Sequence, residues 1–319
     1  MVSNKEKEKK TLLMKSNQQS WSRHLRRYWQ LYTMMALPML YFIIFKYVPL
    51  FGNILAFRRY RPGMGPYGVG WVGLRYFKSF MQDPIFWRAF RNTLILSFGN
   101  LIINLPLPIL FAILLNEVSN LKFKKLVQTV SYMPRFISTV VVIAILNELL
   151  SPSSGLLNNF LSTAFGMRPI YFMNEPQYFR WLYIFTDTWQ FTGWTAIIYL
   201  AAITGISQEL FEAAQIDGAS RIQQIIHVTI PSISPTIMVM FILNVGRMLS
   251  LGFEKVLLMY TPSNSHVSDI IDTLVYRTGL ANQNYSYATA IGLFSGVIGV
   301  ILVSTSNAMS KKFAGDGIY

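Results

Sequence analysis

Two ionisable residues fall inside stretches that are otherwise apolar and long enough to cross a membrane. Asp187 lies in TDTWQFTGW, and Arg247 lies in LNVGRML. A charged side chain at mid-bilayer costs on the order of 3 kcal/mol, so such residues usually serve a pathway, a ligand or a partner helix. These two residues are therefore the first candidates for function.

The neighbours of Asp187 indicate which ligand would suit it. Trp189, Gln190 and Trp194 follow it closely in the sequence. The CH faces of a sugar stack on aromatic rings, while its hydroxyl groups need hydrogen-bonding partners. The stretch therefore predicts that this span lines a pathway for a sugar.

Arg247 is accompanied by Asn244, and the pair suits either an acidic ligand or a contact with a partner subunit. The alternative is that Asp187 and Arg247 satisfy one another, or that each pairs with a neighbouring helix. The sequence alone leaves both interpretations open.

Several kinds of chemistry are missing from the sequence. Cysteine is absent, and the histidines His24, His227 and His266 lie far apart. This composition predicts no disulfide, no thiolate nucleophile and no local metal site. There is no GxxxxGK[ST] phosphate loop, no HExxH and no GxSxG. A membrane-bound enzyme is therefore the weakest interpretation, and ATP-driven transport would need another chain to hydrolyse the ATP.

The candidate residues must be positioned by a membrane protein. Hydrophobic residues make up 52% of the 319 residues, 13% are charged, and the mean hydropathy is +0.37. A helix needs about 20 apolar residues to cross the hydrocarbon core. The sequence predicts an all-α polytopic protein with six transmembrane helices, in the stretches 31–56, 93–115, 132–150, 179–204, 233–251 and 287–308.

Charge predicts the orientation of these spans. The net charge is +14, and residues 1–30 form a basic tail that we expect in the cytoplasm, in contact with anionic lipid. Because this basic run leads directly into an apolar span, a nucleic-acid binder is a poor interpretation of it. Six spans then place the C-terminal tail, 309–319, in the cytoplasm too. The expected inside segments carry 14 Lys and Arg against 11 outside, and seven of those 11 crowd into the first outside loop, in conflict with the positive-inside rule.

That first outside loop begins with turn residues and then becomes aromatic. Its rings predict an interfacial helix with an aromatic belt at headgroup depth. A docking surface for an outside partner or an acidic ligand is the alternative. The rings are Phe77, Phe80, Phe86, Trp87 and Phe90.

A polar insert, 206–231, separates two apolar runs on the expected cytoplasmic side. Ser207 suits the N-cap of a short helix, and Gly218 suits its end, where positive φ is common. A second, amphipathic helix is expected to lie across the cytoplasmic face, with Pro231 marking the entry of the fifth span. Such an insert either closes a loop or fits a groove on another protein.

The insert resembles a known signature. EAAQIDGASRIQQIIHVTIP is similar to the permease signature of binding-protein-dependent ABC importers, with Glu212, Ala213, Ala214 and Gly218 at the matching positions. Val228 and Ile230 are conservative replacements before Pro231. The flanks GFEKVLLMYTPS, IDTLVYRTGL, SKKFAGDGIY, MPRFISTVVVIAIL and SPSSGLLN look like the polysaccharide-transport branch, which is related to the maltose-type permeases and includes alginate-type importers. The resemblance covers residues 30–319.

The resemblance implies a type I ABC importer permease fold in the bacterial inner membrane. The insert, 205–231, would be a coupling helix that sits in a cleft of a cytoplasmic ATPase subunit. Two permeases, usually different, would pair with two ATPase subunits that bind ATP and Mg, and an extracytoplasmic solute-binding protein would deliver the sugar. This chain would bind no cofactor of its own. The ATPase contact falls on Glu212, Ala213, Ala214 and Gly218, with Asp217 and Arg221 as neighbours.

The substrate is open at this level. The expected outside segments carry 11 basic against six acidic residues, which together with Arg247 favours an anionic sugar such as a uronic-acid oligomer. A neutral oligosaccharide is the alternative. A self-sufficient secondary transporter or channel for a small polar solute is the competing class, and solute flux through the chain alone would identify it.

Overall fold

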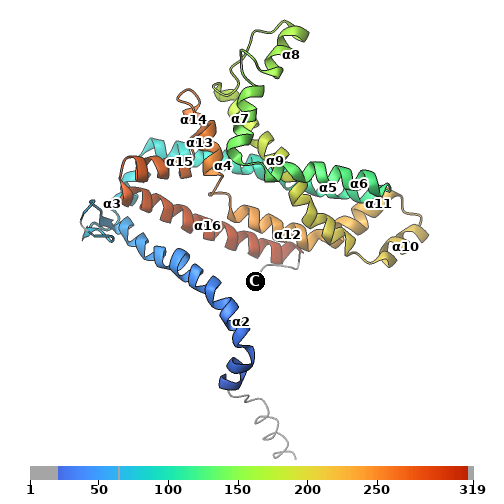
Figure 1. The fold of residues 1–319 in the computed structure, drawn as a ribbon, viewed down its shortest axis with the longest axis horizontal. Helices are drawn as coiled ribbons and strands as arrows, with labels where there is room; N and C mark the ends of the chain where they lie inside the picture. The colour runs from blue at the N-terminus through green and yellow to red at the C-terminus, as the bar shows by residue number, and fades with distance from the viewer. Residues whose placement is uncertain (1–20, 64, 315–319) are drawn as a thin grey trace, which may run out of the picture.

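The computed structural model describes residues 21–63 and 65–314. Most of the basic tail and the last five residues therefore lie outside the described residues. The described part of the chain starts with α2 (Trp21–Phe42), which continues through a π-helical turn, η1 (Ile43–Tyr47), into a 3-10 helix, η2 (Val48–Phe57). Figure 1 shows α2 in blue, projecting away from the remaining helices. This segment corresponds to the first predicted span.

A small hairpin and a short helix follow the first span. The strands β1 (Arg58–Arg59) and β2 (Val69–Trp71) pair in antiparallel fashion, and α3 (Arg75–Met81) comes next. The predicted aromatic belt is wrong for two of its rings. Phe80 and Phe86 are fully buried, because they pack with Phe294 of the last helix in an interior cluster.

The second span is longer than its apolar run. It comprises α4 (Pro84–Asn104), capped by the Asp83 carboxylate at 2.9 Å from the Ile85 amide, and α5 (Pro106–Glu117). The start at Pro84 precedes the predicted start at 93, because a capped N-terminus tolerates the polar residues that hydropathy excludes.

The third predicted span, 132–150, is not one straight helix. The structure has α6 (Leu121–Tyr132), a 3-10 turn, η3 (Met133–Phe136), and then α7 (Thr139–Leu149), with a bend of 101°. Pro134 and the Ser138 cap, whose Oγ accepts from the Val141 amide at 3.4 Å, explain the break. The polar segment before the apolar run is thus helical. α7 contributes Ile143 and Leu146 to the buried cluster that contains Tyr183, and α8 (Leu156–Phe165) projects beyond the bundle (Figure 1).

The fourth span, α9 (Pro176–Thr204), is the centre of the bundle and packs on α4, α5, α6 and α12. Gly193 permits a close approach to α6, because a Cβ at this position would lie 2.2 Å from the Ser131 carbonyl oxygen. The next short helix, α10 (Gln208–Ile216), is bent from α9 by 70°.

The fifth span begins much earlier than predicted. The elements α11 (Arg221–Gln224), the π-helical turn η4 (Ile225–Thr229) and α12 (Ile230–Gly246) form one continuous helix of 26 residues. The expectation of a separate amphipathic helix across the cytoplasmic face is therefore wrong. Pro231 lies inside this continuous helix, two residues after the π-helical turn η4, so it marks no break.

Short helices connect the last two spans: α13 (Phe253–Met259), α14 (Ser265–Ser268), α15 (Ile271–Tyr276) and a π-helical turn, η5 (Arg277–Ala281). The final helix is α16 (Tyr285–Ala314). Within the described residues, four helices are long and apolar enough to cross a membrane, or up to six if each of the two bent pairs counts as one span. The fold is helical apart from the hairpin, as predicted. The hairpin and α10 lie at opposite ends of the bundle (Figure 1).

Candidate functional site

The helix α10 ends in a tight left-handed turn. Gly218 has a φ of +74°, a conformation that favours glycine. The amides of Gly218 and Ala219 donate to the carbonyls of Gln215 and Ala214, at 3.0 and 2.9 Å. The prediction that Gly218 ends this helix is confirmed, and α11 starts just beyond it. We call the segment Gln208–Gln224 the α10 elbow.

The caps of the α10 elbow differ from the prediction. Ser207 occupies the N-cap position of α10, but its side chain accepts no capping hydrogen bond. Ser220 instead caps α11. Its Oγ accepts from the Gln223 amide at 3.4 Å, and the Gln223 side chain accepts from the Ser220 amide at 2.7 Å. The spacing SRIQ signals this capping box, and the sequence reasoning above overlooked it.

The residues predicted for the ATPase contact and its neighbourhood lie together on the surface of the elbow. Ala214 is half-buried, and Arg221 lies 3.9 Å from Glu117 at the end of α5. Both members of that ion pair are exposed, so it contributes little to stability. The exposed members of the set are Glu212, Ala213, Asp217, Gly218 and Arg221.

Large apolar side chains are also exposed around the elbow. Ile216 is 86% exposed and Ile222 is 70% exposed. Phe211 and Ile225 of η4 both line a cavity of about 210 Å³, and α10 contacts the fifth span at η4. Apolar residues that remain exposed beside acidic ones are typical of a surface that contacts another protein.

The buried partner of Asp187 is Lys255, which the sequence reasoning did not consider as a site residue. The Lys255 Nζ of α13 lies 2.6 Å from one carboxylate oxygen of Asp187, and Asn100 Nδ2 lies 2.6 Å from the other. Lys255 also donates to the Tyr183 carbonyl at 3.0 Å and lies 4.6 Å from the centre of the Tyr183 ring. Asp187 is therefore satisfied by neighbouring helices, as one of the two open interpretations held, and Arg247 is not its partner.

The remaining residues predicted around Asp187 do not gather at one point. Gln190 is buried and donates to the Ile137 carbonyl at 2.9 Å, across the break before α7. Trp194 is packed edge-on against Phe136 at 5.6 Å between ring centres. Trp189 is 46% exposed and lies on another side of α9, because residues that are two apart on a helix face about 200° away from each other.

Arg247 and Asn244 lie at the end of α12. Asn244 donates to the carbonyl of Met240 in its own helix, at 2.9 Å. Arg247 is exposed and has no ion-pair partner among the described residues. The structure leaves Arg247 and Trp189 free for a ligand or a second chain.

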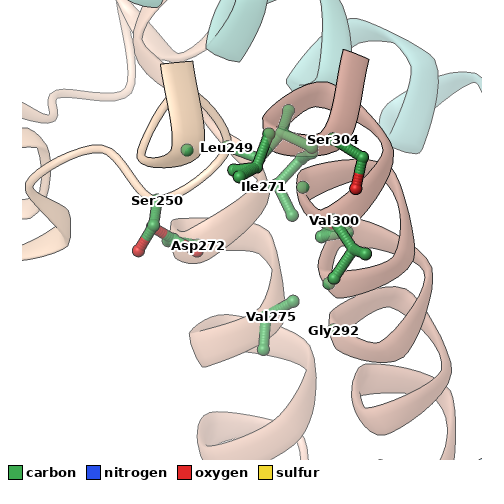
Figure 2. A pocket seen from close by; sticks show the side chains of 13 residues that line it. Leu249, Ser250, Ile271, Asp272, Val275, Gly292, Val300 and Ser304 are labelled. Carbon is green, nitrogen blue, oxygen red and sulfur yellow. The ribbon is translucent and has the colours of Figure 1, made fainter. Parts of the chain in front are cut away.

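A cavity of about 580 Å³ lies between α12, α15 and α16. Figure 2 shows Ser250 and Asp272 on one side of it, and the face of α16 that carries Gly292, Val300 and Ser304 on the other. Burial raises the pKa of Asp272 to about 6. A Cβ at Gly292 would meet no atom within 4 Å, so α16 is not closely packed at this position.

Known proteins resemble this chain over nearly its whole length. Residues 104–313 match the family described as binding-protein-dependent transport system inner membrane component. The polygalacturonan/rhamnogalacturonan transport system permease protein YteP of Bacillus subtilis (strain 168) is 43% identical over 99% of this chain and 95% of that protein. Protein LplB of the same organism is 40% identical over 94% of each chain.

Two solved structures share the fold. One is a bacterial alginate ABC transporter in complex with an alginate pentasaccharide-bound periplasmic protein. The matching chain is 38% identical, with a TM-score of 0.85 over 93% of this chain and 99% of that one. The other is a bacterial ABC transporter involved in the import of the acidic polysaccharide alginate, 40% identical with a TM-score of 0.84 over 91% and 98%. The chain therefore belongs to the family of binding-protein-dependent transport system inner membrane components, and it is a multi-pass permease subunit of an ABC transporter, not an enzyme.

Proposed function

We propose that this chain forms half of the translocation pathway of an ATP-driven importer for an acidic, uronate-containing oligosaccharide. A second, homologous permease subunit forms the other half. Two cytoplasmic ATPase subunits bind ATP and Mg, and an extracytoplasmic solute-binding protein delivers the sugar. The likeness to a polygalacturonan/rhamnogalacturonan permease and to two alginate importers supports the acidic substrate class.

The observation that carries the proposal is the α10 elbow. It combines exposed Glu212 and Ala213 with the exposed Ile216, at one end of a bundle whose sequence has no phosphate-binding loop. A chain that lacks an ATP site but offers such a surface is suited to take its energy from another protein. We assign the ATPase contact to Glu212, Ala213, Ala214 and Gly218, with Asp217 and Arg221 beside them.

The elbow is suited to transmit movement because it is connected to two spans. A short turn joins α10 to α9, and α11 continues without a break into α12. A displacement of α10 by the ATPase therefore acts directly on α9, which carries Trp189, and on α12, which carries Arg247. In this proposal both side chains line the pathway, and both ends of the chain lie on the cytoplasmic side with the elbow.

The function is tested by ATP-dependent uptake of radiolabelled trigalacturonate into proteoliposomes that contain both permeases and the ATPase subunits, with the solute-binding protein added. We expect uptake only with ATP on the ATPase side, and none with this chain alone. Flux through the chain alone, without ATPase subunits, would contradict the proposal and indicate a self-sufficient transporter.

A further inference from the structure

A second cavity, of about 530 Å³, lies between the first part of α9, the middle of α4 and the short helix α14. Volumes of roughly 300–1,000 Å³ are typical of small-molecule sites. Ile95 and Ile184 supply apolar walls. The polar and aromatic groups on its lining are Gln177, Arg180, Trp181 and His266. None of these four residues belongs to the pathway or ATPase contact assigned above.

The guanidinium of Arg180 carries a charge that no acidic side chain of the described residues neutralises. Arg180 forms no ion pair among the described residues, and its buried Nε has no hydrogen-bond partner there. Its Nη2 donates to the Asn92 side-chain oxygen, at a long 3.4 Å. A partly buried, unpaired charge and donor is costly to a protein, which makes it a candidate for recognition of a ligand.

The Asn92 side chain, which accepts the hydrogen bond from Arg180, is itself held in place by two hydrogen bonds. Its amide nitrogen donates to the carbonyls of His266 and Asp269, both at 3.0 Å. Both bonds use the amide hydrogens, so the Asn92 oxygen must point towards Arg180. The Arg180 guanidinium is therefore held in place through Nη2, and its remaining N–H groups are available to a ligand in the cavity.

The free donors and the lining residues fit a sugar carboxylate. A guanidinium binds a carboxylate through two parallel hydrogen bonds, and the N-terminal end of the 29-residue helix α9 adds a field that favours an anion. Trp181 is 68% exposed and offers an indole face to a pyranose ring. Gln177 and His266 supply neutral hydrogen-bonding groups for hydroxyls.

We infer that this cavity is a binding site for one uronate unit of an acidic oligosaccharide, with its carboxylate on Arg180 and its ring on Trp181. The inference rests on the proposed function and assigns charge recognition to a residue outside the pathway positions named above. An anionic lipid headgroup would fit less well, because lipid sites typically present clusters of basic side chains and this cavity has one arginine.

The inference is tested by direct binding. The complete importer, held in nanodiscs of phosphatidylcholine and without the solute-binding protein, is titrated with trigalacturonate in a calorimeter. We expect Arg180→Gln to weaken binding at least tenfold, Arg180→Lys to weaken it less, and Trp181→Ala to weaken it several-fold. The trimethyl ester of the sugar, which has no charge, should bind the unaltered protein as weakly as the acid binds Arg180→Gln.

Arg168→Gln is the matched control, because Arg168 is an exposed arginine outside the cavity. This variant should bind trigalacturonate with the affinity of the unaltered protein. Equal binding of the acid and its ester by the unaltered protein would overturn the inference without relying on any variant. So would equal affinities of the unaltered protein and Arg180→Gln, or a phosphatidylglycerol molecule retained by the unaltered protein and lost from Arg180→Gln. ATP-driven uptake in the separate proteoliposome assay would then leave the proposed function standing.

Discussion

The ammonium group of Lys255 lies 2.6 Å from the carboxylate of Asp187 and joins α13 to the middle of α9 inside the bundle. The Lys255 side chain is only 5% exposed and that of Asp187 17%. Each charge is thus tolerated in its position because the other is present. This ion pair connects α13, which follows the fifth span, to α9, the span that leads into α10.

Removing one member of this pair should destabilise the protein more than removing both. Lys255→Met or Asp187→Asn alone leaves a buried charge without its partner, which costs about 3–5 kcal/mol. The double substitution should recover most of this loss. Thermal unfolding of the four proteins in detergent measures the coupling, and single and double variants whose effects simply add would contradict it.

Gly193→Ala should weaken the contact between α6 and α9. The added methyl group would lie 2.2 Å from the Ser131 carbonyl oxygen, so the two helices must separate. Overpacking of this kind costs about 1–3 kcal/mol and lowers the midpoint of thermal unfolding of the full-length chain.

Gly292→Ala is the matched control, because the new methyl group meets no atom within 4 Å. Its unfolding midpoint should be unchanged or slightly higher, since alanine favours the helix by up to about 1 kcal/mol. An equal loss of stability in the two variants would contradict a specific role of close packing at Gly193.

Asp272 should make stability depend on pH. Its pKa in the folded chain is raised to about 6 from an ordinary 3.8, so folding favours the protonated form. The free energy of unfolding is then highest below about pH 4 and falls as the pH rises to about 6, by about 1 kcal/mol after allowance for solvent screening. Denaturant unfolding at pH 4 and pH 7 measures the difference. Asp272→Asn should remove this part of the pH dependence, and an unchanged profile in the variant would assign it to other groups.

Much of the architecture could be predicted from the sequence because hydropathy reports directly on burial in lipid. Each of the six apolar runs lies mostly in helical segments, although the fifth run, 233–251, extends past the end of α12 at Gly246. The glycine signal at 218 placed the end of α10 correctly. The bend before α7 was harder to predict, because the run 132–150 is apolar on both sides of it. Pro134 and Ser138 were the available signals.

The polar contacts within the spans could not be predicted in the same way. Lys255 follows the fifth predicted span, so the sequence indicates a loop residue. In the structure it lies on the short helix α13 and its side chain contacts Asp187 inside the bundle. Likewise, Trp189, Gln190 and Trp194 are close in sequence but lie on different sides of α9. Contacts between residues far apart in the chain depend on tertiary packing, which one sequence without its fold does not report.

Glu212→Lys tests whether the acidic surface of the elbow transmits the work of the ATPase. The reversed charge on an exposed residue should leave folding and membrane insertion intact while ATP-dependent uptake is lost. Glu175→Lys, an exposed acid at the other end of α9, serves as the control and should retain uptake. Normal ATP-dependent uptake by Glu212→Lys would contradict the assignment of this residue to the ATPase contact.

The most direct test of the central claim is a cross-link between the elbow and the ATPase. The sequence has no cysteine, so Ala213→Cys creates a single thiol in this chain, on the exposed surface of α10. With a short bifunctional reagent on the assembled importer, we expect a product that joins this chain to the ATPase subunit, whereas Arg168→Cys, which the proposed orientation places on the outer side, should give none. If Ala213→Cys formed no such product in an importer that still took up its sugar with ATP, the claim that α10 is the ATPase contact would be contradicted.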